Sequence, residues 1–540
     1  MKIKKSTRKF LKNSLHKKKK PVWKSKSVVK SCGKKESQPT TSKLELPLDN
    51  DLDLPDLDDH LDDLDASDDD LDEDHLDDEE DHDASDDEEC SDAEEVQELD
   101  QLEKILAKIL NSKDNEKELA IKKFCWSFKK VATNKEEISN LKVQEFIIFG
   151  ILQEKVLMEI STCKNSKKYL LSILKSFILL KKSDCIKWEN LLKISNLQLL
   201  FKELSNLKDS SKKELVRTLL KEFQIGQDVS KEEISAFIIA RFIALKVPKL
   251  LEIIFKSFIK ILETLRISNS RNFVKVKFIN SCLVELGGLS LGTTCSLGFL
   301  GIRELALQLK TCLSSTDFKE VQTWAFISKI KIWALIISTY ATPELLHLVY
   351  PLVQVSVGVL RLSINSRNFP MHTTILQSLV ELSTKTGVFI PISSYLMDIL
   401  SHSELVGRAK PSTAKPLDLS VYLTVPSGYQ GTTVYQKGLF EGILNLFYDY
   451  LAIPSISFPE ISVPVTVFLK RWTKKCKNAY MNKNMRVLLE KIQEQVSWTE
   501  QERLNISPMD LKEAVEWTRN VQGSPLQIYN SKRKTMFHNN

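Results

Sequence analysis

Apolar residues recur at helical spacing along almost the whole chain from residue 102 onward, and this pattern constrains the fold more than any other feature. The stretches 169–182 (YLLSILKSFILLKK) and 249–265 (KLLEIIFKSFIKILETL) place aliphatic side chains at i, i+3, i+4 and i+7, which predicts amphipathic helices. Between residues 104 and 342 the sequence holds one proline, Pro248, so backbone chemistry rarely interrupts the pattern.

Polar breaks near 111–115, 161–165, 208–211, 226–230 and 267–272 divide this region into helices of about 12 to 25 residues with short connections. Such a layout predicts an all-α fold in which helical hairpins stack as a HEAT/armadillo-like α-solenoid. The sequence shows no strict repeat period.

After residue 342, prolines stand at the predicted joints between helices, where a first turn tolerates them: Pro343, Pro351, Pro370 and Pro391. Residues 417–425 alternate apolar and other side chains, which predicts one short extended segment ending in a Pro-Ser-Gly turn. Helices are predicted again over 435–450, 463–479 and 484–496.

These patterns divide the folded part of the chain into three regions. Residues 101–280 form the helical N-terminal half of the solenoid, and residues 281–500 form its helical core. Residues 501–540 are a polar C-terminal tail that we expect to be partly disordered.

The first hundred residues carry two opposite charge blocks. Residues 1–43 hold 16 Lys and Arg against one Glu, whereas residues 44–100 hold 31 Asp and Glu and no Lys or Arg. Both blocks are too charged to bury a core, so we expect a disordered basic arm followed by a disordered acidic tract. The block Lys17, Lys18, Lys19 and Lys20 is typical of a nuclear or nucleolar address, or of a non-specific RNA-binding arm.

The acidic tract has two interpretations. It can hold basic partners such as histones or ribosomal proteins, or compete with RNA for the protein's own basic surface. Alternatively, it is a solubilising spacer without a dedicated ligand.

Cysteine usage and hydropathy indicate the compartment. The nine cysteines are scattered, and none forms a C-x-x-C pair, which argues against a disulfide framework and a zinc site and favours a reducing compartment. The lysine-rich N-terminus lacks the apolar core of a signal peptide. The longest apolar stretch, 345–360, contains His347 and Pro351 and suits a buried helix better than a membrane span.

One short motif resembles a catalytic one. Residues 288–292 (GLSLG) match G-x-S-x-G around Ser290, with His347, His372, His402 and Asp398 downstream. A nucleophile elbow requires a parallel α/β sheet, however, and this helix-rich chain shows no βαβ alternation. We therefore interpret the small residues as helix packing and predict no enzyme activity, no metal and no cofactor.

The strongest basic patch in the folded part is 468–486 (FLKRWTKKCKNAYMNKNMR). Helical spacing places several of its cations on one side, next to Trp472 and Tyr480, and such a stripe can follow a phosphate backbone while an aromatic ring stacks on a base. The alternative is a solvated helix face whose aromatics belong to the core. The candidate RNA-binding residues are Lys470, Arg471, Lys474, Lys475, Lys477, Lys483 and Arg486.

Several blocks of the C-terminal half resemble the nucleolar complex protein 2 family. The core blocks are 350–362 (YPLVQVSVGVLRL), 367–400, 415–452 and 458–477 (FPEISVPVTVFLKRWTKKCK), and 297–310 and 324–338 resemble the helices that precede them. The resemblance covers roughly residues 281–498 in the expected order. The family commonly has an Asp-Pro-Glu-Phe-type motif after its acidic region, whereas this chain has no Asp-Pro dipeptide, which leaves residues 101–280 without an assigned role.

The resemblance implies a non-enzymatic α-solenoid factor in large-ribosomal-subunit assembly, found in the nucleus, in both nucleolus and nucleoplasm. It implies a heterodimer with the first or third nucleolar complex protein and association with large-subunit pre-ribosomal particles and pre-rRNA during maturation and export. It implies no membrane contact. The alternative function from another class is a histone-binding chromatin or transcription regulator acting through residues 44–100.

The family positions carried over fall into two kinds. Packing is expected of the first kind, with Tyr350 and Phe389 buried and prolines starting helices: Tyr350, Pro351, Gly358, Pro370, Gly387, Phe389, Pro391, Phe458 and Pro459. Partner contact is expected of the second kind, because several are polar and lie in or beside a loop: Lys415, Asp418, Tyr435 and Gln436.

Overall fold

The computed structural model describes residues 104–110, 114–133, 159–162, 165–182, 209–224, 229–265, 270–315, 317–362, 364–505, 511–521 and 523–538. The predicted basic arm, with Lys17, Lys18, Lys19 and Lys20, and the acidic tract lie outside these residues.

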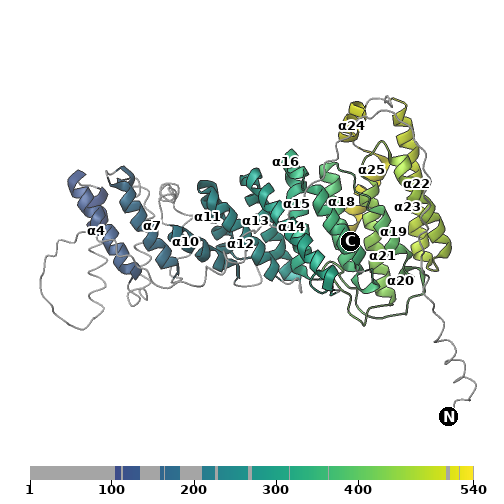
Figure 1. Cartoon of the computed structure of the whole chain (residues 1–540), viewed down its shortest axis with the longest axis horizontal. Coiled ribbons are helices and arrows are strands. Elements are labelled where there is room, and N and C mark those ends of the chain that lie inside the picture. Colours follow the sequence, from purple (N-terminus) through teal and green to yellow (C-terminus); the bar gives the residue numbers. More distant parts are fainter. Residues whose placement is uncertain are drawn as a thin grey trace, which may run out of the picture. The chain divides into compact units, whose positions relative to one another are not determined.

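Every regular element in the described part is a helix, and no strand occurs there, which confirms the all-α prediction. The HEAT/armadillo-like arrangement stays a prediction. In chain order (Figure 1) the elements are α4 (Asp114–Thr133), α7 (Ser166–Lys182), α10 (Asp209–Lys221), η3 (Glu222–Gln224), α11 (Lys231–Lys246), α12 (Pro248–Thr264), α13 (Ser270–Leu289), α14 (Leu291–Ser315), α15 (Trp324–Tyr340), α16 (Pro343–Leu346), α17 (Val349–Leu362), η4 (Ser366–Asn368), α18 (Phe369–Thr386), α19 (Ser393–Ser401), α20 (Ser403–Val406), α21 (Thr433–Leu451), α22 (Phe458–Lys475), α23 (Ala479–Arg503), α24 (Leu511–Asn520) and α25 (Pro525–His538).

Polar residues act as helix caps, and one of them, Ser230, lies in the predicted break 226–230. Ser230 precedes α11, and its hydroxyl accepts a hydrogen bond from the Glu233 backbone N–H at 3.1 Å. Thr323 caps α15 in the same way, accepting from Phe326 N–H at 3.3 Å. Each cap satisfies a backbone donor that has no partner inside the helix, so these helices begin where the sequence changes from polar to apolar.

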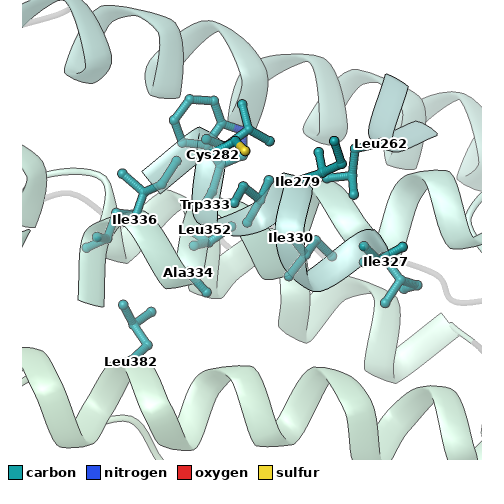
Figure 2. Close-up of a cluster of buried hydrophobic side chains, with 14 of the residues drawn as sticks. Leu262, Ile279, Cys282, Ile327, Ile330, Trp333, Ala334, Ile336, Leu352 and Leu382 are labelled. Carbon is teal, nitrogen blue, oxygen red and sulfur yellow. The ribbon is translucent and has the colours of Figure 1, made fainter. Parts of the chain in front are cut away.

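Helix α15 lies deep in the core. It packs against α12 and α13 and also against α18, so apolar side chains cover most of its circumference. Figure 2 shows Trp333 of α15 beside Cys282 of α13, and Leu382 of α18 on the opposite side of α15, toward Ala334. The Trp333 ring is 1% exposed, and an ideal Cβ on Gly301 of α14 would lie 2.7 Å from its Nε1, so a glycine is needed where α14 crosses the ring.

Three ion pairs join the helices around this core. Lys275 of α13 lies 3.2 Å from the Glu233 carboxylate of α11, and both side chains are 1% exposed. Lys329 of α15 bridges Glu263 of α12 at 2.5 Å and Glu304 of α14 at 2.7 Å. A buried ion pair of this kind favours the observed pairing of helices, because another pairing would leave a buried charge without a partner, which is strongly unfavourable.

The C-terminal part corrects the predicted boundaries. Helix α22 begins at Phe458 rather than at 463, with Pro459 in its first turn and Pro464 inside it, and α23 begins at Ala479 rather than at 484. The predicted polar tail contains α24 and α25, and α25 packs on α21 and α23 with Leu526 fully buried. The region 501–540 has few apolar residues, so its composition did not predict that one leucine would be buried against the neighbouring helices.

The segment 407–432 between α20 and α21 corrects the prediction of an extended stretch near 417–425. The backbone there forms turns and bends, and one isolated bridge joins Lys410 to Thr432. The apolar alternation has another cause: Leu423 and Val425 are buried on the core, where Val425 N–H donates to Arg367 carbonyl at 2.9 Å. A loop lying on helices thus reproduces the period of two that a strand shows.

The stretch Pro343–Leu362 is, among the described residues, the one long and apolar enough to span a membrane by length and composition. In this structure it comprises α16 and α17 and is packed on α14, α15 and α18. Leu352, Val355 and Val359 form its core face. The stretch therefore reads as a core helix pair, and length and composition alone are weak evidence for a span.

Candidate nucleic-acid interface

All seven predicted RNA-binding cations are exposed, on the end of α22, in the turn after it and in the first turns of α23. None of these seven side chains forms an ion pair or a hydrogen bond with another residue that the structure describes. They are Lys470, Arg471, Lys474, Lys475, Lys477, Lys483 and Arg486.

Helix packing explains why the cations of α22 point outward. Val465, Leu469 and Trp472 are buried at i, i+4 and i+7, so they define the core face of the helix. The cations at 470, 471, 474 and 475 occupy the remaining circumference.

The turn between α22 and α23 is held in place by its own caps. The Cys476 N–H donates to Trp472 carbonyl at 2.9 Å, and the Cys476 side chain is buried near the carbonyl of Leu405. Asn478 starts α23 by accepting from Tyr480 N–H at 3.0 Å. Lys477 thus stands at a fixed turn, with cations on both helices beside it.

The aromatic residues do not behave as the sequence predicted. Trp472 is 3% exposed, donates its indole N–H to Leu400 carbonyl at 2.7 Å and stacks on Phe440, so it belongs to the core and cannot stack on a base. Tyr480 is 48% exposed, and its hydroxyl lies 3.0 Å from the Glu441 carboxylate. Burial, and then the hydrogen bond to Glu441, raise the pKa of Tyr480, which keeps the phenol protonated.

The structure adds two cations that the sequence reasoning missed. The Cys476 sulfur lies 3.9 Å from the carbonyl of Leu405, so the loop that leaves α20 starts beside the end of α22. That loop carries Arg408 and Lys410, both exposed. They lie more than 60 residues before Lys475, so nothing in the sequence groups them with the cations of α22. The Pro-Ser pair that follows them does, however, indicate an exposed loop.

We call these nine cations, the seven predicted ones with Arg408 and Lys410, the basic surface. Exposed lysine and arginine side chains without counter-ions can replace the counter-ions of a nucleic-acid backbone, which gives affinity that falls with salt and depends little on sequence. With Trp472 buried, Tyr480 is left as an exposed aromatic residue at this surface, with Lys437 Nζ 5.6 Å from its ring centroid.

The candidate partner-contact residues separate into two pairs. Lys415 and Asp418 are exposed in the segment 407–432, and the Asp418 carboxylate accepts from Ser420 N–H at 3.0 Å. Tyr435 and Gln436 are buried, which contradicts their assignment as contacts.

The buried pair instead holds the loop to the helices. Tyr435 donates its hydroxyl to Ser366 carbonyl at 2.5 Å, and burial raises the pKa of Tyr435. Gln436 donates to the carbonyls of Glu404 and Gly407 at 2.9 and 3.0 Å. Both residues look polar in sequence, but their polar atoms serve buried backbone carbonyls.

The family positions expected to pack show two errors. Tyr350 is 72% exposed and Phe389 is 59% exposed, so the prediction that both are buried is wrong. The others take structural places: Pro351 and Pro459 in first turns, Pro370 and Phe458 buried, Pro391 just before α19, Gly358 against Leu309, and Gly387 ending α18 at φ 70°.

The G-x-S-x-G match lies at the joint of α13 and α14. The Ser290 hydroxyl is 2.9 Å from that of Thr293, not from a histidine. An ideal Cβ on Gly288 would lie 2.2 Å from the Tyr340 hydroxyl, which donates to Val284 carbonyl at 2.7 Å. The small residues permit this close contact, as the packing interpretation requires.

Other chemistry is sparse in the part of the chain that the structure describes. No group of three or more His, Cys, Asp or Glu there has a geometry suited to a metal ion. The five cysteines described are free, and burial raises the pKa of Cys125 to about 12. Such a thiol is almost fully protonated and a poor nucleophile.

Comparison with known proteins relates most of the helical part to one family. A model described as the Noc2p family matches residues 249–533, which confirms the resemblance and extends it beyond 281–498 at both ends. An uncharacterized NOC2 family protein of Schizosaccharomyces pombe is 35% identical over 272 residues, covering 47% of this chain and 38% of the relative.

Two relatives carry descriptive names. Nucleolar complex protein 2 of Drosophila melanogaster is 29% identical over 266 residues, covering 47% of this chain and 35% of the relative. Nucleolar complex-associated protein 2 of Arabidopsis thaliana is 28% identical over 251 residues, covering 45% of this chain and 33% of the relative. This chain therefore aligns with little more than a third of each relative's length.

Proposed function

The chain belongs to the Noc2p family, and we propose that it is a non-enzymatic assembly factor for the large ribosomal subunit. The names of the relatives support a role in a nucleolar complex and a nucleolar location, with passage through the nucleoplasm as part of the proposal. Its helices, arranged as an α-solenoid, would serve as a scaffold in a heterodimer with the first or third nucleolar complex protein during maturation and intranuclear transport or export.

The observation that carries the RNA side of this proposal is the basic surface. Seven exposed cations lie on α22, the α22–α23 turn and α23, none with a counter-ion in the described part of the chain, and the loop that carries Arg408 and Lys410 starts beside the end of α22. A pre-rRNA strand supplies the polyanion that such a surface binds. The predicted basic arm, 1–43, would add a second contact, and Lys17, Lys18, Lys19 and Lys20 a nuclear address.

For partner contact we propose the exposed Lys415 and Asp418 on the segment 407–432. The segment is closed on itself where Lys410 N–H donates to Gly431 carbonyl at 2.8 Å, and it is joined to the core where Val425 N–H donates to Arg367 carbonyl at 2.9 Å. An anchored loop presents polar side chains at small entropic cost on binding.

The test is sedimentation of the tagged full chain from nuclear extract on a sucrose gradient, with and without RNase. Co-migration with large-subunit precursors, together with stoichiometric recovery of a second nucleolar complex protein, is the expected result. A variant with Lys474, Lys475 and Lys477 changed to Glu should leave those fractions if the basic surface holds RNA.

The same experiment distinguishes the histone-binding alternative, which the family names do not favour. Recovery of histones with nothing in the pre-ribosomal fractions would refute the assembly role. Deleting residues 44–100 should leave pre-ribosome association largely intact under the proposed function and abolish histone binding under the alternative.

A further inference from the structure

Two neighbouring helices expose apolar side chains on adjoining faces. Phe299, Leu307 and Leu313 of α14 are 58%, 52% and 54% exposed, and Tyr350 of α17 is 72% exposed. We call these four residues the α14–α17 face. Large apolar side chains gathered on a surface favour binding of another apolar segment.

Close packing brings the two helices together. An ideal Cβ on Gly358 of α17 would lie 2.7 Å from Leu309 of α14, and one on Gly298 of α14 would lie 2.6 Å from Leu348 just before α17. Both contacts advance along the chain in the same order, so the helices run in parallel. Their exposed faces therefore flank one seam.

The α14–α17 face is also cationic. Arg303 and Lys310 of α14 and Arg361 of α17 are exposed, and none forms an ion pair with a residue that the structure describes. The acid on this part of α14, Glu304, pairs with Lys329. An occupant of matching chemistry would combine aliphatic anchors with carboxylates.

We propose that the α14–α17 face binds residues 52–76 of this same chain. This segment contains 13 Asp and Glu, no Lys or Arg, and leucines at 57, 61, 64 and 71, spaced by four, three and seven residues. RNA supplies the negative charge but no aliphatic side chain, so the apolar face selects the leucine-bearing polyanion.

The connecting chain is long enough. From residue 76 to residue 104 there are 28 residues, which reach at most about 95 Å when extended. Helix contacts lead from α4 to α14 through α7, α10, α11 and α13, five steps of about 10 Å each. Adding the length of α14, about 38 Å, still leaves the path within reach.

Photo-crosslinking of the purified full chain tests this proposal. Tyr350→p-benzoylphenylalanine keeps an aromatic ring at the exposed position, and mass spectrometry of a mixture of ¹⁵N-labelled and unlabelled chains separates contacts within one chain from contacts between two. The expected result is crosslinks from position 350 to residues 52–76 of the same chain. Phe389→p-benzoylphenylalanine is the control, because Phe389 is similarly exposed at 59% but lies off the face.

A second variant separates apolar recognition from charge attraction. Changing Leu57, Leu61 and Leu64 to Ser retains every carboxylate, and we expect at least a fivefold fall in crosslink yield at position 350. An unchanged yield would overturn the proposal, as would crosslinks to a second copy, crosslinks that avoid residues 52–76, or an equal yield at position 389. No RNA is present in this assay, so its outcome is independent of the RNA-binding part of the proposed function.

Discussion

Neutralising lysines of the basic surface should weaken RNA binding by an amount that the structure allows us to estimate. Lys470, Lys474, Lys475 and Lys477 are exposed, and none has an ion pair among the described residues. Their replacement by Gln therefore removes charge without breaking a contact. For single-stranded nucleic acid each phosphate contact contributes about 0.7 to the slope of log K against log salt, so four contacts contribute about 2.8.

This slope converts directly into affinity. If the variant and the parent bind equally at 1 M salt, the variant should bind about 600-fold more weakly at 0.1 M. The assay is fluorescence anisotropy of a labelled single-stranded RNA, titrated with the full chain at several salt concentrations. The N-terminal basic arm contributes equally to both proteins, so the difference in slope reports the basic surface.

The matched control replaces four exposed lysines of α11 and α12 by Gln, of which Lys246 lies over the Phe242 ring: Lys231, Lys246, Lys249 and Lys260. It keeps the net charge equal to that of the test variant, so general attraction between protein and RNA falls by the same amount. The reasoning is refuted if the slope of the test variant drops by less than about 1, or if the control loses as much slope and affinity as the test variant does.

Three further predictions concern the helical core and are read from denaturant unfolding and hydrogen exchange of the full chain. Lys275→Met should lower the free energy of unfolding by about 3 to 5 kcal/mol, because it leaves the Glu233 carboxylate buried and unpaired. The double variant Lys275→Met with Glu233→Leu should recover most of this stability, and an equal loss in both variants would contradict the reasoning. Desolvation raises the pKa of the Glu233 carboxyl in the folded protein. The stability that this group contributes is therefore fully present below about pH 4.5, its ordinary pKa, and is lost as the pH rises through the raised pKa. Glu233→Gln should remove this pH dependence from a series of unfolding midpoints. Gly301→Ala should cost about 1 to 3 kcal/mol by pushing a methyl group against Trp333, while Gly292→Ala, with open space around its Cβ, should be neutral or stabilising, and the reverse order would show that the contact at Gly301 relaxes freely.

The helices were predictable because their signals are local. Apolar spacing marked α12, and the polar break at 226–230 placed the cap of α11, since a side chain three residues from a backbone donor is close to it in any helix. The exposure of the seven cations on α22 and α23 followed from the same periodicity.

Exposure of individual aromatic residues was not predictable in this way. Trp472 lies among lysines yet packs on Phe440, and Tyr350 begins an apolar block yet faces outward. Helical periodicity specifies which residues share a face, but a long apolar helix such as α17 has more apolar positions than its neighbours cover.

Local chemistry along the chain thus accounts for the helical class, most helix starts in the core, the family relationship and the charge blocks. Packing between distant segments accounts for the rest: Leu405 beside the end of α22, Tyr435 and Gln436 as anchors of a loop, and Leu526 burying one side of the C-terminal helix in the core. Hydrogen bonds inside a helix join residues four apart, whereas burial depends on which surfaces meet after folding, and that information is spread over the whole chain.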